Sequence, residues 1–131
     1  MLVDTSVRID YFNGHASAQA DRLAQAIADA EPIALPGLVW TQILMGLRTE
    51  AEAARIADLL DAFEFVREPV RSDCIAAAGI YRTCRSKGNI IRSTIDCVIA
   101  QLCLRDGRPL LFKDRDFRAI SQSFPLKQIE A

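Results

Sequence analysis

Short apolar runs alternate with longer segments whose apolar residues recur at helical spacing, and this alternation constrains the fold more than any other feature of the sequence. The expected strands cover residues 2–3, 33–35, 65–66, 110–112 and, as an edge strand, 126–129. The expected helices cover residues 7–12, 17–30, 36–47, 50–63, 70–86, 93–105 and 114–123. Short strands joined through helices require right-handed crossovers and a mostly parallel sheet that is covered on both faces. The sequence therefore predicts an α/β fold.

The chain has the size and composition of one compact domain. It has 131 residues, half of them hydrophobic, and we expect residues 1–131 to form a single domain. The net charge is only −1, so a polyanionic partner has to be held by a local group of basic residues. The sequence shows no basic leader and no apolar run long enough to span a membrane, so we expect a cytoplasmic protein without a membrane partner.

The cysteines and the single histidine do not indicate a zinc site. Cys74, Cys84, Cys97 and Cys103 show no Cys-x-x-Cys spacing, and His15 is remote from them in sequence. Free cysteines are commonly small, buried, apolar side chains, and this interpretation is favoured here.

Several aspartates come directly after expected strands. Asp4 follows the first strand, and Asp114 and Asp116 come shortly after the fourth. In an open parallel sheet the functional crevice lies beyond the carboxyl ends of the strands, so these acids should share one edge. Asp96 lies in the first turn of an expected helix and joins them only if that helix begins at the same crevice.

Each of these acids also has a purely structural explanation. Asp4 and Asp114 are placed to cap the helices that follow them, and residues 93–96 resemble a capping box with Asp96 in place of the usual glutamate. Taken together, the acids favour a metal site, because carboxylates ~4 Å apart repel by about 4 kcal/mol at an effective dielectric of about 20 unless a cation lies between them. Ligand oxygens without histidine or thiol indicate Mg²⁺ or Mn²⁺.

A metal site of this kind suits the hydrolysis of phosphodiester bonds. The ion lowers the pKa of a bound water, orients it for in-line attack and stabilises charge on the leaving oxygen. Between Cys74 and Ile95 the sequence has no acid, but it has four basic residues that can hold a polyanion: Arg82, Arg85, Lys87 and Arg92. Arg92 is nearest to Asp96 and is the favoured phosphate contact. An ordinary solvated helix face explains the same charges about equally well.

Three motifs follow one another along the chain. They are Asp4-Thr5-Ser6 after the first strand, Arg92-Ser93-Thr94-Ile95-Asp96, and Lys113-Asp114-Arg115-Asp116-Phe117. Together they resemble a PIN domain, specifically a VapC-type toxin of a bacterial toxin-antitoxin pair, over essentially the whole chain. The resemblance implies a three-layer α/β/α sandwich with a mostly parallel sheet of about five strands, an acidic site for Mg²⁺ or Mn²⁺, and endonucleolytic cleavage of RNA.

The resemblance also implies roles for individual residues. Asp4, Asp96 and Asp114 match the metal-binding aspartates of the family, and Asp116 matches a frequent supporting acid. Ser6 matches a hydroxyl near the metal. The candidate contacts to the RNA are, besides Ser6, the polar residues in and before the second motif: Arg85, Lys87, Arg92 and Ser93.

Proteins of this family usually dimerise and are silenced by a VapB antitoxin, which wraps the groove and binds promoter DNA. The resemblance therefore implies four partners for this chain. They are an RNA substrate, a second copy of the chain, a cognate VapB-like antitoxin, and promoter DNA that is contacted only through the antitoxin complex.

One residue departs from the family pattern. The helix after the second strand normally reads Thr-Glu-Ile-Leu, whereas this sequence has Thr41-Gln42-Ile43-Leu44. An amide keeps the shape and a carbonyl oxygen but loses the negative charge and gains an NH₂ group that cannot ligate a cation, so metal affinity should fall. Gln42 is either a natural variant with a weaker site or a deliberate Glu→Gln change in a toxic protein. The near-isosteric replacement at only this position favours the second explanation.

Two other classes of protein compete with the nuclease interpretation. A phosphorylated receiver domain needs an acidic pair after the first strand and an aspartate after the third, but Asp4 stands alone and Arg67 follows residues 65–66. A haloacid-dehalogenase-like phosphatase needs Asp-x-Asp at the first strand, which is absent. The remaining alternative is a catalytically silent module that binds RNA or an antitoxin, and Gln42 adds weight to it.

Overall fold

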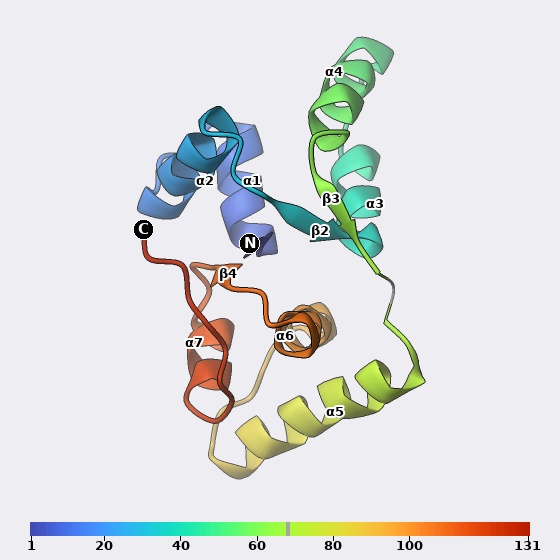
Figure 1. The fold of residues 1–131 in the computed structure, drawn as a ribbon. Coiled ribbons are helices and arrows are strands. Elements are labelled where there is room, and N and C mark those ends of the chain that lie inside the picture. The colour runs from blue at the N-terminus through green and yellow to red at the C-terminus, as the bar shows by residue number, and fades with distance from the viewer. Residues whose placement is uncertain (68) are drawn as a thin grey trace.

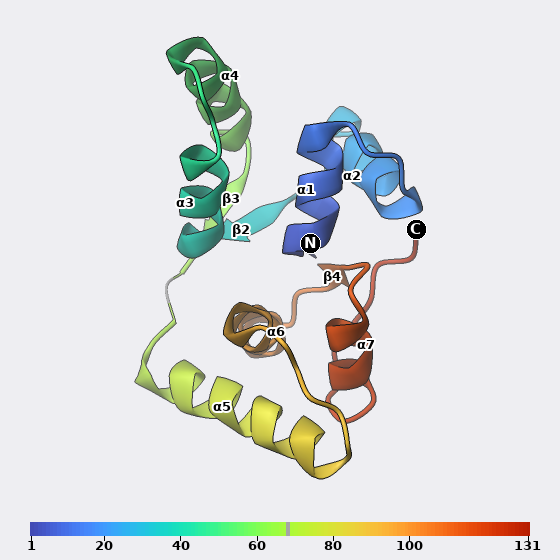
Figure 2. The ribbon, with the colours of Figure 1, turned by 180° about the vertical axis from the view of Figure 1, so that it is seen from behind.

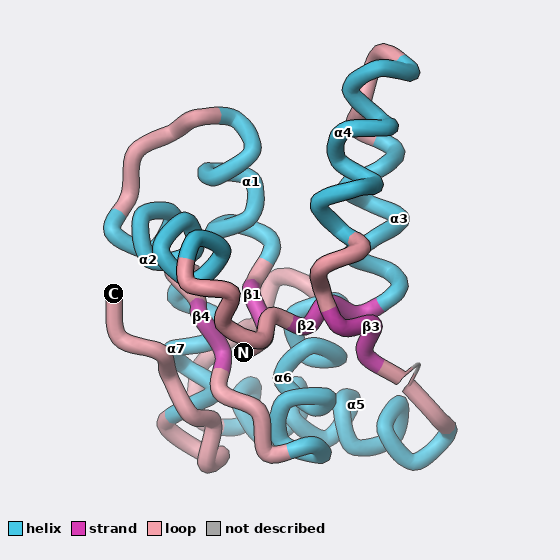
Figure 3. Tube along the Cα trace, turned by 45° about the horizontal axis from the view of Figure 1, so that its top comes forward, coloured by secondary structure: helices cyan, strands magenta, loops and turns pink. Residues whose placement is uncertain are grey.

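The computed structural model describes residues 1–67 and 69–131 and has a parallel sheet at its centre (Figures 1 and 3). Its strands, in the order β3-β2-β1-β4, are β1 (Leu2–Val3), β2 (Ala34–Pro36), β3 (Glu64–Val66) and β4 (Leu110–Leu111). β1 pairs in parallel with β2 and β4, and β2 pairs in parallel with β3. The chain therefore adds strands on one side of β1 first and then returns to its other side.

Helices cover both faces of this sheet. In the described residues they are α1 (Thr5–Asn13), α2 (Ala18–Ala28), α3 (Gly37–Met45), α4 (Glu50–Leu60), α5 (Arg71–Ser86), α6 (Thr94–Asp106) and α7 (Arg115–Ser121). Figures 1 and 2 show α1 and α2 on one side of the sheet and α5, α6 and α7 on the other, while α3 and α4 form an arm beside β2 and β3. The predicted α/β/α sandwich is confirmed. Among the described helices, none combines the length and the apolar composition that a membrane span requires.

The two strands at the centre of the site are almost completely buried. Leu2, Val3, Leu110 and Leu111 are at most 1% exposed, because helices pack on both faces of β1 and β4. Burial on both faces explains why these strands appear in the sequence as continuous apolar runs and not as an alternating pattern.

Polar caps and glycines set the ends of several helices. Asp4 and Ser17 begin α1 and α2, their side chains accepting hydrogen bonds from backbone N–H groups in the first turn. Gly14 and Gly107 end α1 and α6 with positive φ angles, a conformation that glycine adopts without strain. These local signals are visible in the sequence, and the predicted helices agree with the observed ones to within a few residues.

The sheet has four strands where about five were expected. Residues 126–129, predicted as an edge strand, form only an isolated parallel bridge between Gln128 and Leu110. Leu110 donates to the carbonyl of Lys127 and accepts from the N–H of Ile129, both at the same residue of β4. Residues 126–129 therefore approach β4 at one position and do not extend the sheet as a fifth strand.

The strand order determines where a site can form. β1 lies between β2 and β4, so the connections that leave β1 and β4 diverge at their carboxyl ends, where open parallel sheets place their ligands. Val3 and Leu111 are register partners, and the N–H of Asp4 donates to the carbonyl of Leu111 at 3.0 Å. The residues that follow both strands therefore emerge side by side.

Candidate metal centre

Three aspartates from two helices meet at this edge and are called the acidic cluster below: Asp96, Asp114 and Asp116. Each brings one carboxylate oxygen to within 4.8 Å of the others. Asp96 and Asp116 are buried, whereas Asp114 is half-buried. A set of carboxylate oxygens alone is the kind of ligand that Mg²⁺ and Mn²⁺ prefer.

The start of α7 positions two members of the acidic cluster. Asp114 is the N-cap of α7, and its Oδ1 accepts a hydrogen bond of 2.9 Å from the N–H of Asp116. Asp116 lies in the first turn, where the helix dipole favours negative charge. Phe117 packs against Phe112 in the core and anchors this turn beneath the site. Capping and membership of the acidic cluster are therefore not alternatives for Asp114, which does both.

Asp4 lies beside the acidic cluster and ties the two strand ends together. Its Oδ1 accepts from Ser6 Oγ at 2.9 Å and from the N–H of Val7 at 2.8 Å, and its Oδ2 accepts from the N–H of Lys113 at 3.1 Å. It is 1% exposed. A carboxylate has about four lone-pair directions, so Asp4 keeps roughly one for a further ligand.

Asp96 is the most perturbed acid of the site. Burial, followed by the negative charges of Asp114, Asp116 and Asp4, raises its pKa to about 7, and Arg92 opposes this rise. The start of α6 does reach the crevice, as the geometric argument for Asp96 required.

The capping box that residues 93–96 resemble, the structural alternative for Asp96, is not formed. Ser93 is the N-cap residue of α6 but makes no side-chain hydrogen bond there. The reason is the direction of the Asp96 side chain, which lies among the other acids of the cluster and not against the backbone of Ser93.

Arg92 lies directly against the acidic cluster, on the loop between α5 and α6 that runs beside α7 in Figure 2. Its Nη2 is 3.5 Å from Asp114 Oδ1, its Nε is 3.8 Å from Asp116 Oδ2, and its N–H donates to Asp116 Oδ2 at 3.1 Å. Its side chain is 58% exposed, so these ion pairs are weak and leave the guanidinium able to turn toward a ligand. The structure places it at the mouth of the site.

The other predicted RNA contacts fall into two groups. Ser6 donates to Asp4 and Ser93 begins α6, so both belong to the acidic edge. Arg85 and Lys87 lie at the end of α5, where the Arg85 guanidinium stacks over Tyr81 and Lys87 Nζ donates to Ser123 Oγ at 3.0 Å. Within the described residues, no ion pair joins Arg85 or Lys87 to the acidic cluster.

Gln42 shares a cavity with Arg8 and makes no hydrogen bond to the acids among the described residues. It lies on α3, and its Oε1 is buried with no hydrogen-bond partner among the described residues. It lines a cavity of about 220 Å³ together with Arg8 of α1, whose guanidinium is close enough to Asp4 to feel its charge. Position 42 is therefore connected to the acidic edge through Arg8.

Three charged residues around the site were not predicted to have a role there: Arg8, Asp10 and Lys113. Lys113 Nζ pairs with Asp10, and its hydrogen bond lowers the pKa of that carboxyl. Asp10 and Lys113 are far apart in sequence, so no local pattern indicates their pairing. For Arg8 a signal existed, since it stands four residues after Asp4 and thus on the same face of one helix.

Comparisons with known proteins agree with this geometry. The family model for the PIN domain matches residues 1–122. The chain is 33% identical over 123 residues to ribonuclease VapC11 of Mycobacterium tuberculosis and to VapC ribonuclease Mb1587 of Mycobacterium bovis. The aligned region covers 93% of this chain and 92% of each relative.

Solved structures share the fold at lower identity. VapBC2 from Rickettsia felis, bound to a DNA fragment from their promoter, superposes with a TM-score of 0.70 at 20% identity, covering 98% of this chain and 96% of that one. A toxin-antitoxin complex from Klebsiella pneumoniae gives 0.69 at 18% identity, covering 96% and 98%. From the family match and the two mycobacterial relatives, the chain belongs to the PIN domain family and, within it, to the VapC proteins.

Proposed function

We propose that this protein is a metal-dependent endoribonuclease toxin that hydrolyses RNA phosphodiester bonds and is inhibited by a VapB-like antitoxin. Its relatives are named VapC ribonucleases. The observation that carries the proposal is the gathering of the acidic cluster beside Asp4 at one edge of the sheet. Anions this close repel one another, and a divalent cation between them removes the repulsion.

The residues present fit Mg²⁺ or Mn²⁺. Asp96, Asp114 and Asp116 would hold the ion, and Asp4 would add an oxygen or act through its charge. Burial and the neighbouring acids raise the pKa of Asp96, and a cation bound among these acids would lower it. When bound, such an ion supplies an activated water and stabilises the leaving oxygen.

The surrounding residues bind and orient the RNA strand and the acids. Arg92, exposed and only weakly paired, turns its guanidinium to a phosphate oxygen next to the acidic cluster. Ser6 and the backbone of Lys113 hold the Asp4 carboxylate in place through hydrogen bonds. Ser93 at the start of α6, and Arg85 and Lys87 at the end of α5, would contact neighbouring nucleotides.

Gln42 is proposed to weaken the metal site. A glutamate at this position would add a negative charge that the amide lacks. The codon in the source gene decides whether the glutamine is natural.

The proposed partners of this chain are those found in the structural neighbours. Both are toxin-antitoxin complexes, and one is bound to promoter DNA. We propose that this chain likewise pairs with a VapB-like antitoxin, reaches promoter DNA only through it, forms a homodimer and acts in the cytoplasm. Exposed apolar side chains on α3 and β3 offer such protein partners a surface: Leu38, Leu44, Met45 and Phe65.

RNA cleavage by the purified protein tests the nuclease proposal. Cleavage should require Mg²⁺ or Mn²⁺, stop in EDTA, and disappear in Asp4→Asn and Asp96→Asn while antitoxin binding is kept. Cleavage that continues at the same rate in EDTA would contradict the metal-dependent mechanism.

A catalytically silent module that binds RNA or the antitoxin is the second candidate, and Gln42 is the observation that favours it. If neither this chain nor its Gln42→Glu variant cleaves RNA with either ion, although both bind the antitoxin, the silent module replaces the nuclease.

A further inference from the structure

The surface between α7 and the loop that follows α5 contains a hollow of about 450 Å³, called the loop hollow below. A hollow of this size holds a small organic ligand, since pockets for such ligands measure roughly 300–1,000 Å³. The side chains that line it include two arginines, two amides, one apolar residue and one acid: Arg115, Arg118, Asn89, Gln122, Ile90 and Asp116.

Contacts with the rest of the fold hold the loop at both of its ends. Lys87 Nζ donates to Ser123 Oγ at 3.0 Å, and the N–H of Arg92 donates to Asp116 Oδ2 at 3.1 Å. Between these two contacts Ile91 is only 3% exposed and anchors the loop in the core. Figure 2 shows the loop running beside α7. The loop hollow is therefore formed without a ligand.

Two arginines of the loop hollow have no acidic partner among the described residues. Arg115 and Arg118 are exposed, and the ion pairs of this region are made by Arg92 instead. Residues three apart on a helix lie on the same face, so the two guanidinium groups point to one side of α7. Guanidinium groups bind phosphate oxygens through charge-assisted hydrogen bonds, and two on one face suit neighbouring phosphates of a single strand.

The other side chains of the loop hollow suit a nucleobase. Ile90 is 59% exposed and offers an apolar surface to the flat face of a base. The side-chain amides of Asn89 and Gln122 make no hydrogen bond to a described residue, so their donors and acceptors are available. Amides of this kind bind the edges of unstacked bases in single-stranded RNA.

The loop hollow adjoins the acidic cluster directly. Asp116 belongs to the acidic cluster and also lines the loop hollow. A strand that has one phosphodiester at the acidic cluster therefore reaches the loop hollow with an adjacent nucleotide.

We propose that the loop hollow is a subsite for one unstacked nucleotide of the RNA strand, beside the bond that is cleaved. Arg115 and Arg118 bind backbone phosphates. The base lies on Ile90, and the amides of Asn89 and Gln122 bond to its edge. The inference rests on the proposed ribonuclease function and names the residues that give the site a preference for certain bases.

The phosphate contact is tested by the salt dependence of RNA binding. A fluorescent single-stranded RNA is titrated with the protein in EDTA, so that no cleavage interferes, at several salt concentrations. Each phosphate contact to a single strand contributes about 0.7 to the slope of log K against log salt, so Arg118→Gln should lower the magnitude of the slope by about 0.7. Arg118→Lys keeps the charge and should keep the slope.

Arg55→Gln is the matched control, because it removes the same charge from another exposed helix. Arg55 lies on α4, in the arm that Figure 1 shows far from α7. This variant should retain the slope of the unsubstituted chain. Thermal unfolding establishes which variants are folded, and if Arg118→Gln is not, Arg115→Gln should lower the slope in its place.

The base contact is tested with four short RNAs, each made of a single kind of nucleotide, in a lithium buffer that keeps the guanylate strand unpaired. We expect this chain to bind the four with different affinities. Gln122→Ala removes one amide, so it should reduce the ratio between the best-bound and the worst-bound RNA by about fivefold, the effect of one hydrogen bond. Gln25→Ala on α2, across the sheet, is the control and should leave the ratio unchanged.

An unchanged slope in folded Arg118→Gln overturns the subsite, and so does a ratio that is unchanged in Gln122→Ala or already close to one in this chain. A loss of antitoxin binding in Arg118→Gln without a change in the RNA slope would assign the loop hollow to the protein partner and also overturns it. If the binding changes are found but this chain cleaves no RNA with either ion, the subsite stands and the nuclease proposal fails.

Discussion

Asp73 and Asp96 are both buried aspartates in the first turns of neighbouring helices, but their surroundings are opposite. Asp73 accepts hydrogen bonds from the N–H of Val70 at 3.0 Å, from Arg105 Nη1 at 2.9 Å and from Gln101 Nε2 at 3.3 Å. The Val70 bond, with Arg105 and Gln101, lowers the pKa of Asp73, whereas burial and neighbouring acids raise the pKa of Asp96 to about 7.

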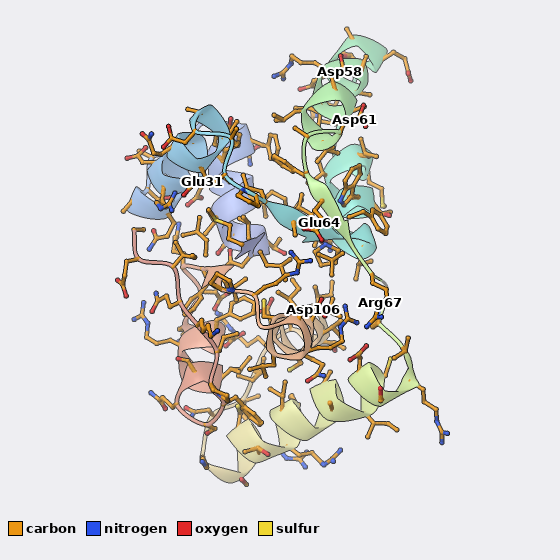
Figure 4. The ribbon with its side chains drawn as sticks, in the orientation of Figure 1. Glu31, Asp58, Asp61, Glu64, Arg67 and Asp106 are labelled. Carbon is orange, nitrogen blue, oxygen red and sulfur yellow. The ribbon has the colours of Figure 1, made fainter. Side chains whose placement is uncertain are left out.

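Asp73 belongs to a larger group of paired charges, called the paired region here. Arg105 bonds to Asp106 as well as to Asp73, and Arg108 pairs with Glu64 and Asp106. Figure 4 shows Glu64, Arg67 and Asp106 around this end of α6. Every acid of the paired region has a basic partner.

The acidic cluster has fewer basic partners per acid than the paired region. Among the residues that the structure describes, three acids and the adjoining Asp4 face one exposed guanidinium, that of Arg92. Charges in the paired region stabilise the folded chain, while those of the acidic cluster destabilise it until a cation is present. This difference distinguishes a structural group of acids from a functional one.

The largest expected difference between the two regions is in catalysis. Asp96→Asn should lower RNA cleavage about a thousandfold, since it removes a ligand from an ion that contributes several kcal/mol to the transition state. Asp73→Asn should cleave at close to the wild-type rate under conditions where it is folded. Single-turnover cleavage at saturating Mg²⁺ measures both variants, and equal losses would mean that the two regions do not differ in function.

The second difference is in the pH dependence of stability without a divalent ion. The pKa of Asp96 is raised on folding, so the folded state binds more protons and loses stability as pH rises from about 4 through 7. Asp96→Asn should remove this loss, which is about 4 kcal/mol, and so be more stable than the unsubstituted chain at pH 8. Urea unfolding in EDTA at pH 5 and pH 8 checks the sign; a variant less stable at pH 8 contradicts it.

Asp73 should show the opposite sign. Its pKa is lowered on folding, so its contribution is complete above the ordinary pKa of an aspartate and is lost as pH falls below it. Asp73→Asn should reduce the free energy of unfolding at pH 7 by about 2 kcal/mol, because Arg105 loses one of its two carboxylates. Asp58→Asn on the exposed face of α4 is the control and should change the free energy of unfolding by less than about 0.5 kcal/mol.

The smallest expected effect concerns position 42. Gln42→Glu should tighten Mn²⁺ binding by only about threefold, since Arg8 pairs with the new carboxylate, and by about tenfold when combined with Arg8→Gln. Calorimetric titration with Mn²⁺ measures both. A large gain in Mn²⁺ affinity for Gln42→Glu alone would show that position 42 faces the ion and not Arg8.

The sequence predicted the fold and most of the acidic edge for identifiable reasons. Leu2-Val3 and Leu110-Leu111 are buried on both faces, so they appear as uninterrupted apolar runs, and Asp4, Asp114 and Gly107 are local signals that act within a few residues. Parallel pairing then brings the acids after these strands to one edge without any knowledge of side-chain contacts.

The remaining features depend on contacts between distant parts of the chain. Lys113 and Asp10 pair across the sheet edge, and Arg8 meets Gln42 only because α1 and α3 line one cavity. The edge strand predicted at 126–129 is reduced to a single bridge to Leu110, a difference that the residues themselves do not reveal.

Binding of a divalent cation by the acidic cluster can be seen by anomalous diffraction from crystals soaked in Mn²⁺. We expect one anomalous peak bonded to carboxylate oxygens of Asp96, Asp114 and Asp116, at about 2.2 Å. A peak located elsewhere, or no peak there at saturating Mn²⁺ in crystals that leave this edge open to solvent, would contradict it.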